Sequence, residues 1–217
     1  MKGLLIKDLN LMKNMMRVMI AIVIFSVIFS TIGENLFFCM GYVSVFVAVF
    51  SVSTISYDEY DNGFDYLFCF PFERKHYVQE KYLFGLGMIV IGVLASAAIS
   101  FGISGFRGQL VTVSELLAVS VASISTAIFM ISLVLPAHIK YGSEKGRVAM
   151  IVIFLVLGVI GGAVYGLTTM LGIDLDGLIE PLFYSPVKML LVAGVFAAAI
   201  MVISYLISVK IIEKKEF

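Results

Sequence analysis

Six long apolar segments constrain this chain more than any other feature of its sequence. A helix that crosses a bilayer needs about 20 mostly apolar residues, in a range of roughly 17–25. Arg17, at the edge of the first segment, is the one charged residue inside them. We therefore predict an all-α membrane protein with six transmembrane helices. The predicted spans are Met15–Ile32, Leu36–Ile55, Leu83–Ser104, Leu116–Pro136, Val148–Leu171 and Met189–Val209.

The segments between the spans alternate in charge. One set holds 13 of the 15 Lys and Arg residues and leaves Arg107 and Lys188 to the other set. Because Lys and Arg are in excess on the cytoplasmic side of a membrane, we predict that both termini are cytoplasmic. We expect residues 1–217 to form a single transmembrane domain, with no soluble catalytic domain. The basic set comprises Arg17 and segments 1–14, 56–82, 137–147 and 210–217.

The first stretch, Gly3–Met16, has the pattern of an amphipathic helix. Apolar residues recur at helical spacing on one face, and Lys or Asn residues occupy the others, which suits the headgroup boundary of a bilayer. We predict an in-plane helix; the alternative is a plain cytoplasmic extension of the first span. The residues assigned to the in-plane helix are Leu5, Lys7, Leu9, Met12, Lys13 and Arg17.

The segment from Ser56 to Tyr82 is long for a simple connection. Acidic residues precede a short aromatic run, a proline follows, and basic residues lead into the third span. An aromatic run outside the bilayer needs some surface to cover it, so we predict a short docking helix for a cytoplasmic partner. The alternative is a helix folded back on the membrane. The residues assigned to docking are Gly63, Phe64, Tyr66, Leu67, Phe70, Pro71, Arg74 and Lys75.

Three glycines follow one another at intervals of four along the fifth span: Gly158, Gly162 and Gly166. Small residues at this spacing let a second helix approach closely. The sequence leaves two interpretations open, which are packing within one subunit and an interface between subunits.

Several kinds of chemistry are not indicated. The middle of each span lacks a charged residue, which counts against an ion-driven transporter. The chain has no phosphate-binding loop and no H-E-x-x-H pair, and its net charge of zero gives no sign of nucleic-acid binding. We expect no metal site and no catalytic residue. Cys39 and Cys69 are expected to be unpaired thiols, because one lies in a span and the other in a loop.

The loop residues together resemble one family. An acidic residue and a glycine four positions later, followed by Leu, Pro, Arg, Val and Lys before a span, are similar to the permeases of ABC-2 type transporters. The N-terminal stretch, the six spans and the broken segment Leu171–Pro186 also resemble that family, particularly small bacterial permeases that export phenol-soluble modulins and other amphipathic peptides. The loop positions are Glu59, Gly63, Leu67, Pro71, Arg74, Val78 and Lys81.

This resemblance implies a half-transporter in a bacterial plasma membrane. Two permeases, identical or different, would form the path for an amphipathic peptide or another hydrophobic molecule. Separate ATPase subunits would bind ATP and Mg, and this chain would hold no cofactor. The resemblance also implies that residues 62–71 form a coupling helix on the ATPase, and that residues 3–16 lie in the membrane plane beside it.

Two other functions stay open from the sequence. One is a membrane-embedded enzyme, which turnover by the isolated chain would reveal. The other is an immunity or scaffold protein that sequesters a toxin without ATP. Co-purification of an ATPase distinguishes a transporter from both.

Overall fold

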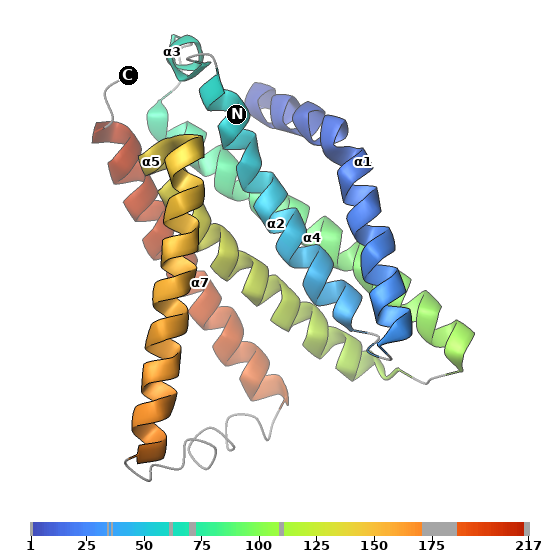
Figure 1. Ribbon diagram of the computed structural model, residues 1–217. Helices are drawn as coiled ribbons and strands as arrows, with labels where there is room; N and C mark the ends of the chain where they lie inside the picture. Colours follow the sequence, from blue (N-terminus) through green and yellow to red (C-terminus); the bar gives the residue numbers. More distant parts are fainter. Residues whose placement is uncertain are drawn as a thin grey trace.

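The computed structural model describes residues 2–33, 35, 37–60, 63–69, 73–108, 111–170 and 186–214, and over these ranges it is built from helices and contains no strand. Five long helices and one short helix follow one another along the chain (Figure 1). Their bounds are α1 Lys2–Ile32, α2 Phe38–Glu59, α3 Gly63–Phe68, α4 Arg74–Arg107, α5 Val113–Met170 and α7 Pro186–Lys214.

The six predicted spans are confirmed. Six helical segments in the described ranges are long and apolar enough to cross a membrane. Most of them extend past the predicted windows, because a helix continues into the polar boundary where hydropathy has already fallen. The observed segments are Gly3–Ile32, Phe38–Glu59, Arg74–Arg107, Val113–Gly142, Val148–Thr168 and Leu190–Lys214.

Helix α5 contains two of these spans and corrects one prediction. We predicted a charged loop over residues 137–147, but helical structure continues through Pro136 to the turn at Gly142 and resumes beyond it. Gly142 has φ 79° and ψ 179°, a conformation that is essentially reserved for glycine. A Cβ at this position would also clash with the carboxylate of Glu59. The chain therefore reverses direction in a very short turn (Figure 1).

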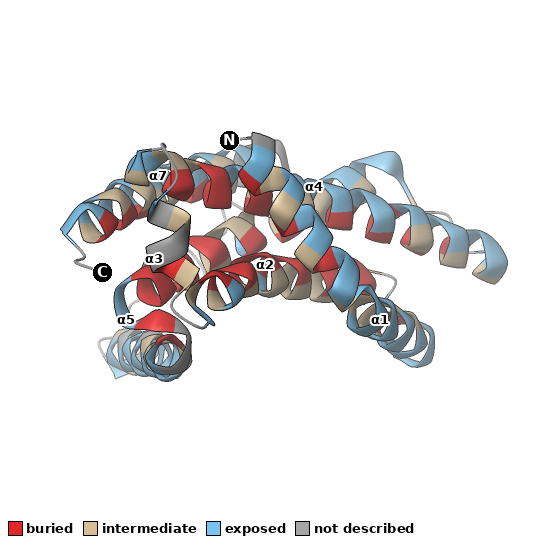
Figure 2. Ribbon diagram, turned by 90° about the horizontal axis from the view of Figure 1, so that it is seen from above, coloured by how far each residue is buried: buried red, intermediate tan, exposed pale blue. Residues whose placement is uncertain are grey.

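The main core lies between α2, α4, the first span of α5, and α7. Its fully buried side chains include Ile55 of α2, Tyr77 and Ile89 of α4, Leu135 of α5 and Ile212 of α7. Buried residues face the interior of this group in Figure 2, whereas outward faces are exposed and apolar, as lipid contact requires.

A smaller apolar cluster joins α1 to α2. It is formed by Cys39, Val43 and Val47, against which residues of α1 pack. Cys39 is buried and Cys69 is exposed, and neither forms a disulfide bond in the described part of the chain.

A buried polar contact compensates for the proline in α5. Pro136 has no N–H, so the carbonyl of Ser132, four residues earlier, loses its partner within the helix. The Ser204 hydroxyl of α7 donates to that carbonyl at 2.5 Å. Ser204 in turn lies 2.5 Å from the Tyr82 hydroxyl of α4, which also contacts Ser208 at 3.1 Å. Three helices are thus joined where α5 would otherwise be weakened.

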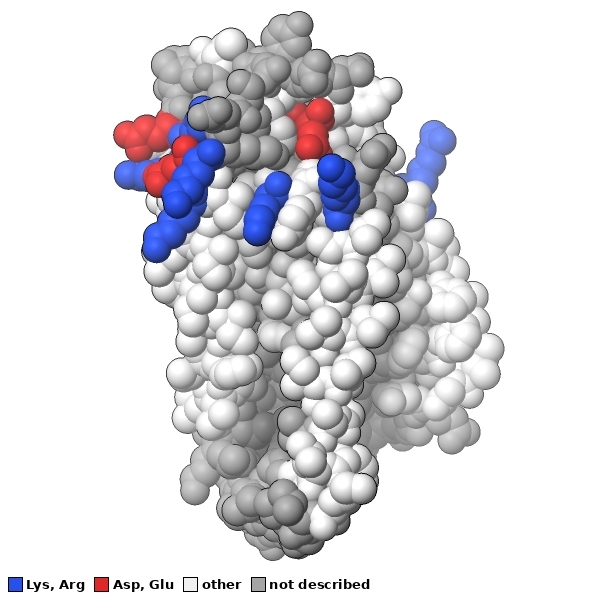
Figure 3. All heavy atoms as spheres, turned by 60° about the vertical axis from the view of Figure 1, so that its left-hand side comes forward, with Lys and Arg blue, Asp and Glu red and all other residues white. Residues whose placement is uncertain are grey.

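Charged side chains gather at one end of the molecule. The start of α1, the end of α7 and α3 lie at this end in Figure 1. The visible Lys, Arg, Asp and Glu residues form a band there in Figure 3, and the described surface below it is uncharged. An apolar slab bounded by a charged end is the surface expected of a membrane protein.

Candidate functional site

Four charged residues from three helices meet near the charged end of the molecule. The Nζ atom of Lys81 lies 2.5 Å from Oδ2 of Asp8 and 2.8 Å from Oδ2 of Asp58. Lys7 pairs with the other oxygen of Asp58 and lies 3.4 Å from Oδ1 of Asp8. We refer to Lys7, Asp8, Asp58 and Lys81 as the ion cluster.

Two hydroxyl groups complete the ion cluster. Thr54 Oγ1 accepts a hydrogen bond from Lys81 at 3.0 Å and lies 3.2 Å from Asp8. Tyr77 donates to Oδ2 of Asp58 at 3.0 Å. The side chains of Asp8, Asp58 and Lys81 are at most 5% exposed, so these charges depend on one another for solvation.

The short helix α3 rests directly on this ion cluster. Phe64 is buried and meets the Tyr77 ring edge to face, with centroids 5.8 Å apart and an interplanar angle of 80°. A Cβ at Gly63 would lie 2.5 Å from the carbonyl oxygen of Asp58, so a glycine is required for the close approach. Through these contacts, α3 reaches the charges that join α1, α2 and α4.

Arg74 links the start of α4 to the end of α7. Its guanidinium donates to the carbonyl oxygens of Ile212 at 3.2 Å and Glu213 at 3.4 Å. Cations interact favourably with the unpaired carbonyls at a helix C-terminus. Lys75 points outward and pairs with Glu73 at 3.3 Å.

These contacts show which of the predicted docking residues are available on the surface. The predicted short helix exists, but Phe64 contacts the protein's own core, so its side chain is not part of an exposed docking surface. Leu67 packs partly against the same core. Cys69 and Lys75 are exposed. Phe70 and Pro71 lie outside the described residues, as does the side chain of Tyr66.

The N-terminal stretch is helical, and the face that it buries includes a charged residue. Residues 3–16 are not a separate helix but the first part of α1, which bends before it descends (Figure 1). Its buried positions are Leu4, Asp8 and Met12, four residues apart. Asp8 takes the central position because it pairs with Lys81.

The other residues assigned to the N-terminal stretch vary in exposure. Leu9, Lys13 and Arg17 are exposed, whereas Leu5 and Lys7 are partly buried. The structure gives no test of whether this part of α1 lies in the plane of a membrane.

The three glycines of the fifth span face open space. A Cβ added at Gly158, Gly162 or Gly166 would meet nothing within 4 Å. None of the most apolar window of Val148–Thr168 is buried. Side chains larger than glycine would therefore meet no steric obstacle at these three positions in the described part of this chain.

Sequence reasoning missed the ion cluster. Asp8, Asp58 and Lys81 lie just outside three predicted spans, and each was assigned to a polar segment. A signal was present, because the predicted topology places all three residues at the same end of the bundle. What the sequence does not show is that the three helices come close enough to bury them.

Other polar groups do not form a reactive centre in the described residues. Glu80 is buried, and neither of its carboxylate oxygens has a hydrogen-bond partner among them. The same ranges contain no group of three His, Cys, Asp or Glu residues that could hold a metal ion. With two lysines and two aspartates, the ion cluster is suited to holding helices together.

Six apolar spans with most of their described charges at one end define a polytopic membrane protein. A family model described as "ABC-2 family transporter protein" matches residues 3–213, so the chain belongs to this family. It is therefore a membrane permease component of an ABC transporter, that is, a transport subunit. Members of the family generally work with ATPase subunits and form dimers. No curated protein and no solved structure matches the chain.

Proposed function

We propose that this protein is the permease subunit of an ATP-driven exporter in a bacterial plasma membrane. Residues 1–217 form one transmembrane domain with both termini in the cytoplasm. A separate ATPase binds ATP and Mg and acts on α3. The substrate is an amphipathic peptide or another hydrophobic molecule, as for the permeases that this sequence resembles.

The placement of α3 on the ion cluster carries this proposal. A helix of six residues is too short to be stable by itself, so its position depends on what it contacts. Phe64 fixes it on Tyr77, and Tyr77 is hydrogen bonded to Asp58. A force on α3 would reach α1 and α4 through Lys81, which pairs with both aspartates.

The same contacts favour motion of the helices as a unit. Breaking a buried ion pair by removing one partner costs about 3–5 kcal/mol, so α1, α2 and α4 are held firmly where they meet. Arg74 adds α7 to this group through the carbonyls at its end. Rigid elements that shift between discrete packings are the usual basis of a switching transition.

A second permease fits the fifth span. Its apolar surface is unburied, and the glycine stripe leaves room for a helix backbone to approach. We propose that this surface contacts a second permease, either the same chain or a related one.

The test uses the exposed thiol of Cys69. The protein is purified from its native membranes with the ATPase that accompanies it, and a short thiol-to-amine crosslinker is added. We expect a crosslink from Cys69 to the ATPase. The control carries Cys69→Ser and Phe106→Cys, which places an exposed thiol at the other end of α4.

Two results would contradict the proposal. One is the absence of any nucleotide-hydrolysing subunit in the purified complex. The other is an equal ATPase crosslink from the Phe106→Cys control, which would place the ATPase away from α3. If the ATPase acts on α3, the yield of the ATPase crosslink from Cys69 must exceed the yield from the Phe106→Cys control.

A further inference from the structure

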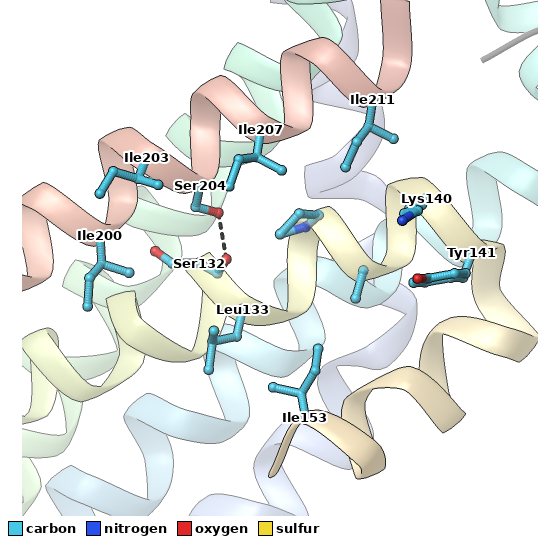
Figure 4. A pocket seen from close by; sticks show the side chains of 12 residues that line it. Ser132, Leu133, Lys140, Tyr141, Ile153, Ile200, Ile203, Ser204, Ile207 and Ile211 are labelled. Carbon is cyan, nitrogen blue, oxygen red and sulfur yellow. Dashed lines mark hydrogen bonds between the residues drawn. The ribbon is translucent and has the colours of Figure 1, made fainter. Parts of the chain in front are cut away.

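A groove runs between α5 and α7 on the outside of the bundle. It has a volume of about 390 Å³, within the roughly 300–1,000 Å³ of ligand sites. Figure 4 shows isoleucines along most of its length, with Lys140 and Tyr141 at one end beside Ile211. Its apolar wall is formed mainly by Ile153, Ile200, Ile203, Ile207 and Ile211.

The polar end of the groove carries a cation. Lys140 is exposed and makes no ion pair with any described residue. Its ammonium instead lies 5.0 Å from the centre of the Tyr141 ring. Both residues immediately precede the turn at Gly142, at the charged end of the molecule. Lys and Tyr side chains at this level are typical of the headgroup boundary.

We propose that this groove binds one anionic phospholipid, with its phosphate at Lys140 and an acyl chain along the isoleucines. The charge at one end and the apolar wall beyond it match the two parts of that molecule. Basic pockets between transmembrane helices on the cytoplasmic side bind anionic headgroups in the same way. The site is separate from α3 and does not depend on the proposed transport function.

The groove opens toward the lipid phase, which favours a lipid chain as its occupant. Ile203 and Ile207 on its wall are about half exposed, at 57% and 47%.

The absence of tryptophan from the sequence permits a direct test. Ile207→Trp places a fluorophore in the groove, and the matched control is Leu206→Trp. Leu206 is the next residue along α7 and lies outside the groove lining with 54% exposure, so both probes have nearly the same membrane depth. Each variant is reconstituted in phosphatidylcholine vesicles containing brominated-chain phosphatidylglycerol or, at the same mole fraction, brominated-chain phosphatidylcholine.

We expect brominated phosphatidylglycerol to quench Ile207→Trp more than brominated phosphatidylcholine does, and Leu206→Trp to show no preference. In the Ile207→Trp background, Lys140→Gln should lower the relative affinity for the anionic lipid about fivefold, the contribution of one lysine near an anionic surface. Lys140→Arg should keep the preference, because it keeps the charge.

Three results would overturn the proposal. Equal quenching of Ile207→Trp by both lipids would mean that the groove does not select a headgroup. A preference that survives Lys140→Gln would place the anionic site elsewhere. If neither lipid quenches Ile207→Trp while both quench Leu206→Trp, a protein segment or substrate occupies the groove.

Discussion

Lys81 illustrates how one buried charge can organise several helices. It stands on α4 and contacts a carboxylate from α1 and another from α2. In an apolar interior each aspartate would be costly alone, so the three helices approach in the arrangement that brings the lysine between them. Because the charges must meet in one register, the ion cluster specifies how the helices are placed.

Replacing Lys81 tests this role. Lys81→Met removes the cation that Asp8 and Asp58 share and should destabilise the protein by about 3–5 kcal/mol. Lys75→Met on the same helix removes a half-exposed pair with Glu73 and should cost at most about 1 kcal/mol. Thermal unfolding of both variants in detergent compares them.

A second substitution distinguishes charge from packing. Adding Asp8→Leu to Lys81→Met removes the stranded carboxylate and leaves the pair between Lys7 and Asp58, so part of the lost stability should return. If Lys81→Met unfolds at the same temperature as Lys75→Met, the ion cluster contributes nothing measurable. If the double variant is less stable than Lys81→Met alone, the unpaired buried carboxylate of Asp8 is not what destabilises Lys81→Met.

The helices themselves show what the sequence could predict and what it could not. Hydropathy identified all six spans, because a bilayer imposes the same length and polarity on each of them. It failed over residues 137–147, where charged residues suggested a loop although a single glycine completes the reversal. It gave no indication of the inner face of α1, because Asp8 is buried by a lysine that is distant in sequence.

At the candidate site, too, one part was predictable from the sequence and another was not. A short helix before Pro71 was predictable from its local composition. Its seating on Tyr77 and Asp58 was not, because those contacts depend on how α2 and α4 approach one another. The residues that hold α3 in place are therefore brought together by tertiary contacts, which a single sequence does not reveal.

Gly142→Ala tests the turn within α5. Alanine at φ 79° and ψ 179° is strained by about 1–3 kcal/mol, and its methyl group would also displace Glu59. We expect a clear fall in thermal stability. Gly161→Ala, at a helical glycine with open space around it, should be neutral or stabilising by about 0.5–1 kcal/mol. Equal stability of the two variants would mean that the turn has another conformation.

The fifth span is the least buried of the six spans in the described part of the chain. The other spans each bury part of their most apolar window, whereas this one buries none. Exposed apolar residues are normal against lipid, but a glycine stripe gains nothing from lipid contact. A second permease at this surface would use the stripe and enlarge the interface.

Gly162→Leu should weaken that association. A leucine at the centre of the stripe would hold the facing helix away, whereas Val159→Leu on the same span leaves the stripe intact. The yield of crosslinked permease pairs in native membranes measures the difference. Equal yields for the two variants would show that the stripe faces lipid and that the subunits associate elsewhere.

The final prediction concerns the direction of the chain in the membrane. The skew of Lys and Arg residues places α3 and Cys69 in the cytoplasm. A membrane-impermeant thiol reagent should leave Cys69 unlabelled in intact cells and label it after permeabilisation; Cys39 is buried and should not react in either case. Phe106→Cys in a Cys69→Ser background should behave in the opposite way, because Phe106 is 98% exposed at the far end of α4. Labelling of Cys69 in sealed cells, together with protection of Phe106→Cys, would show that the chain has the opposite orientation in the membrane. It would then exclude α3 as the contact for a cytoplasmic ATPase while leaving the six-span fold unchanged.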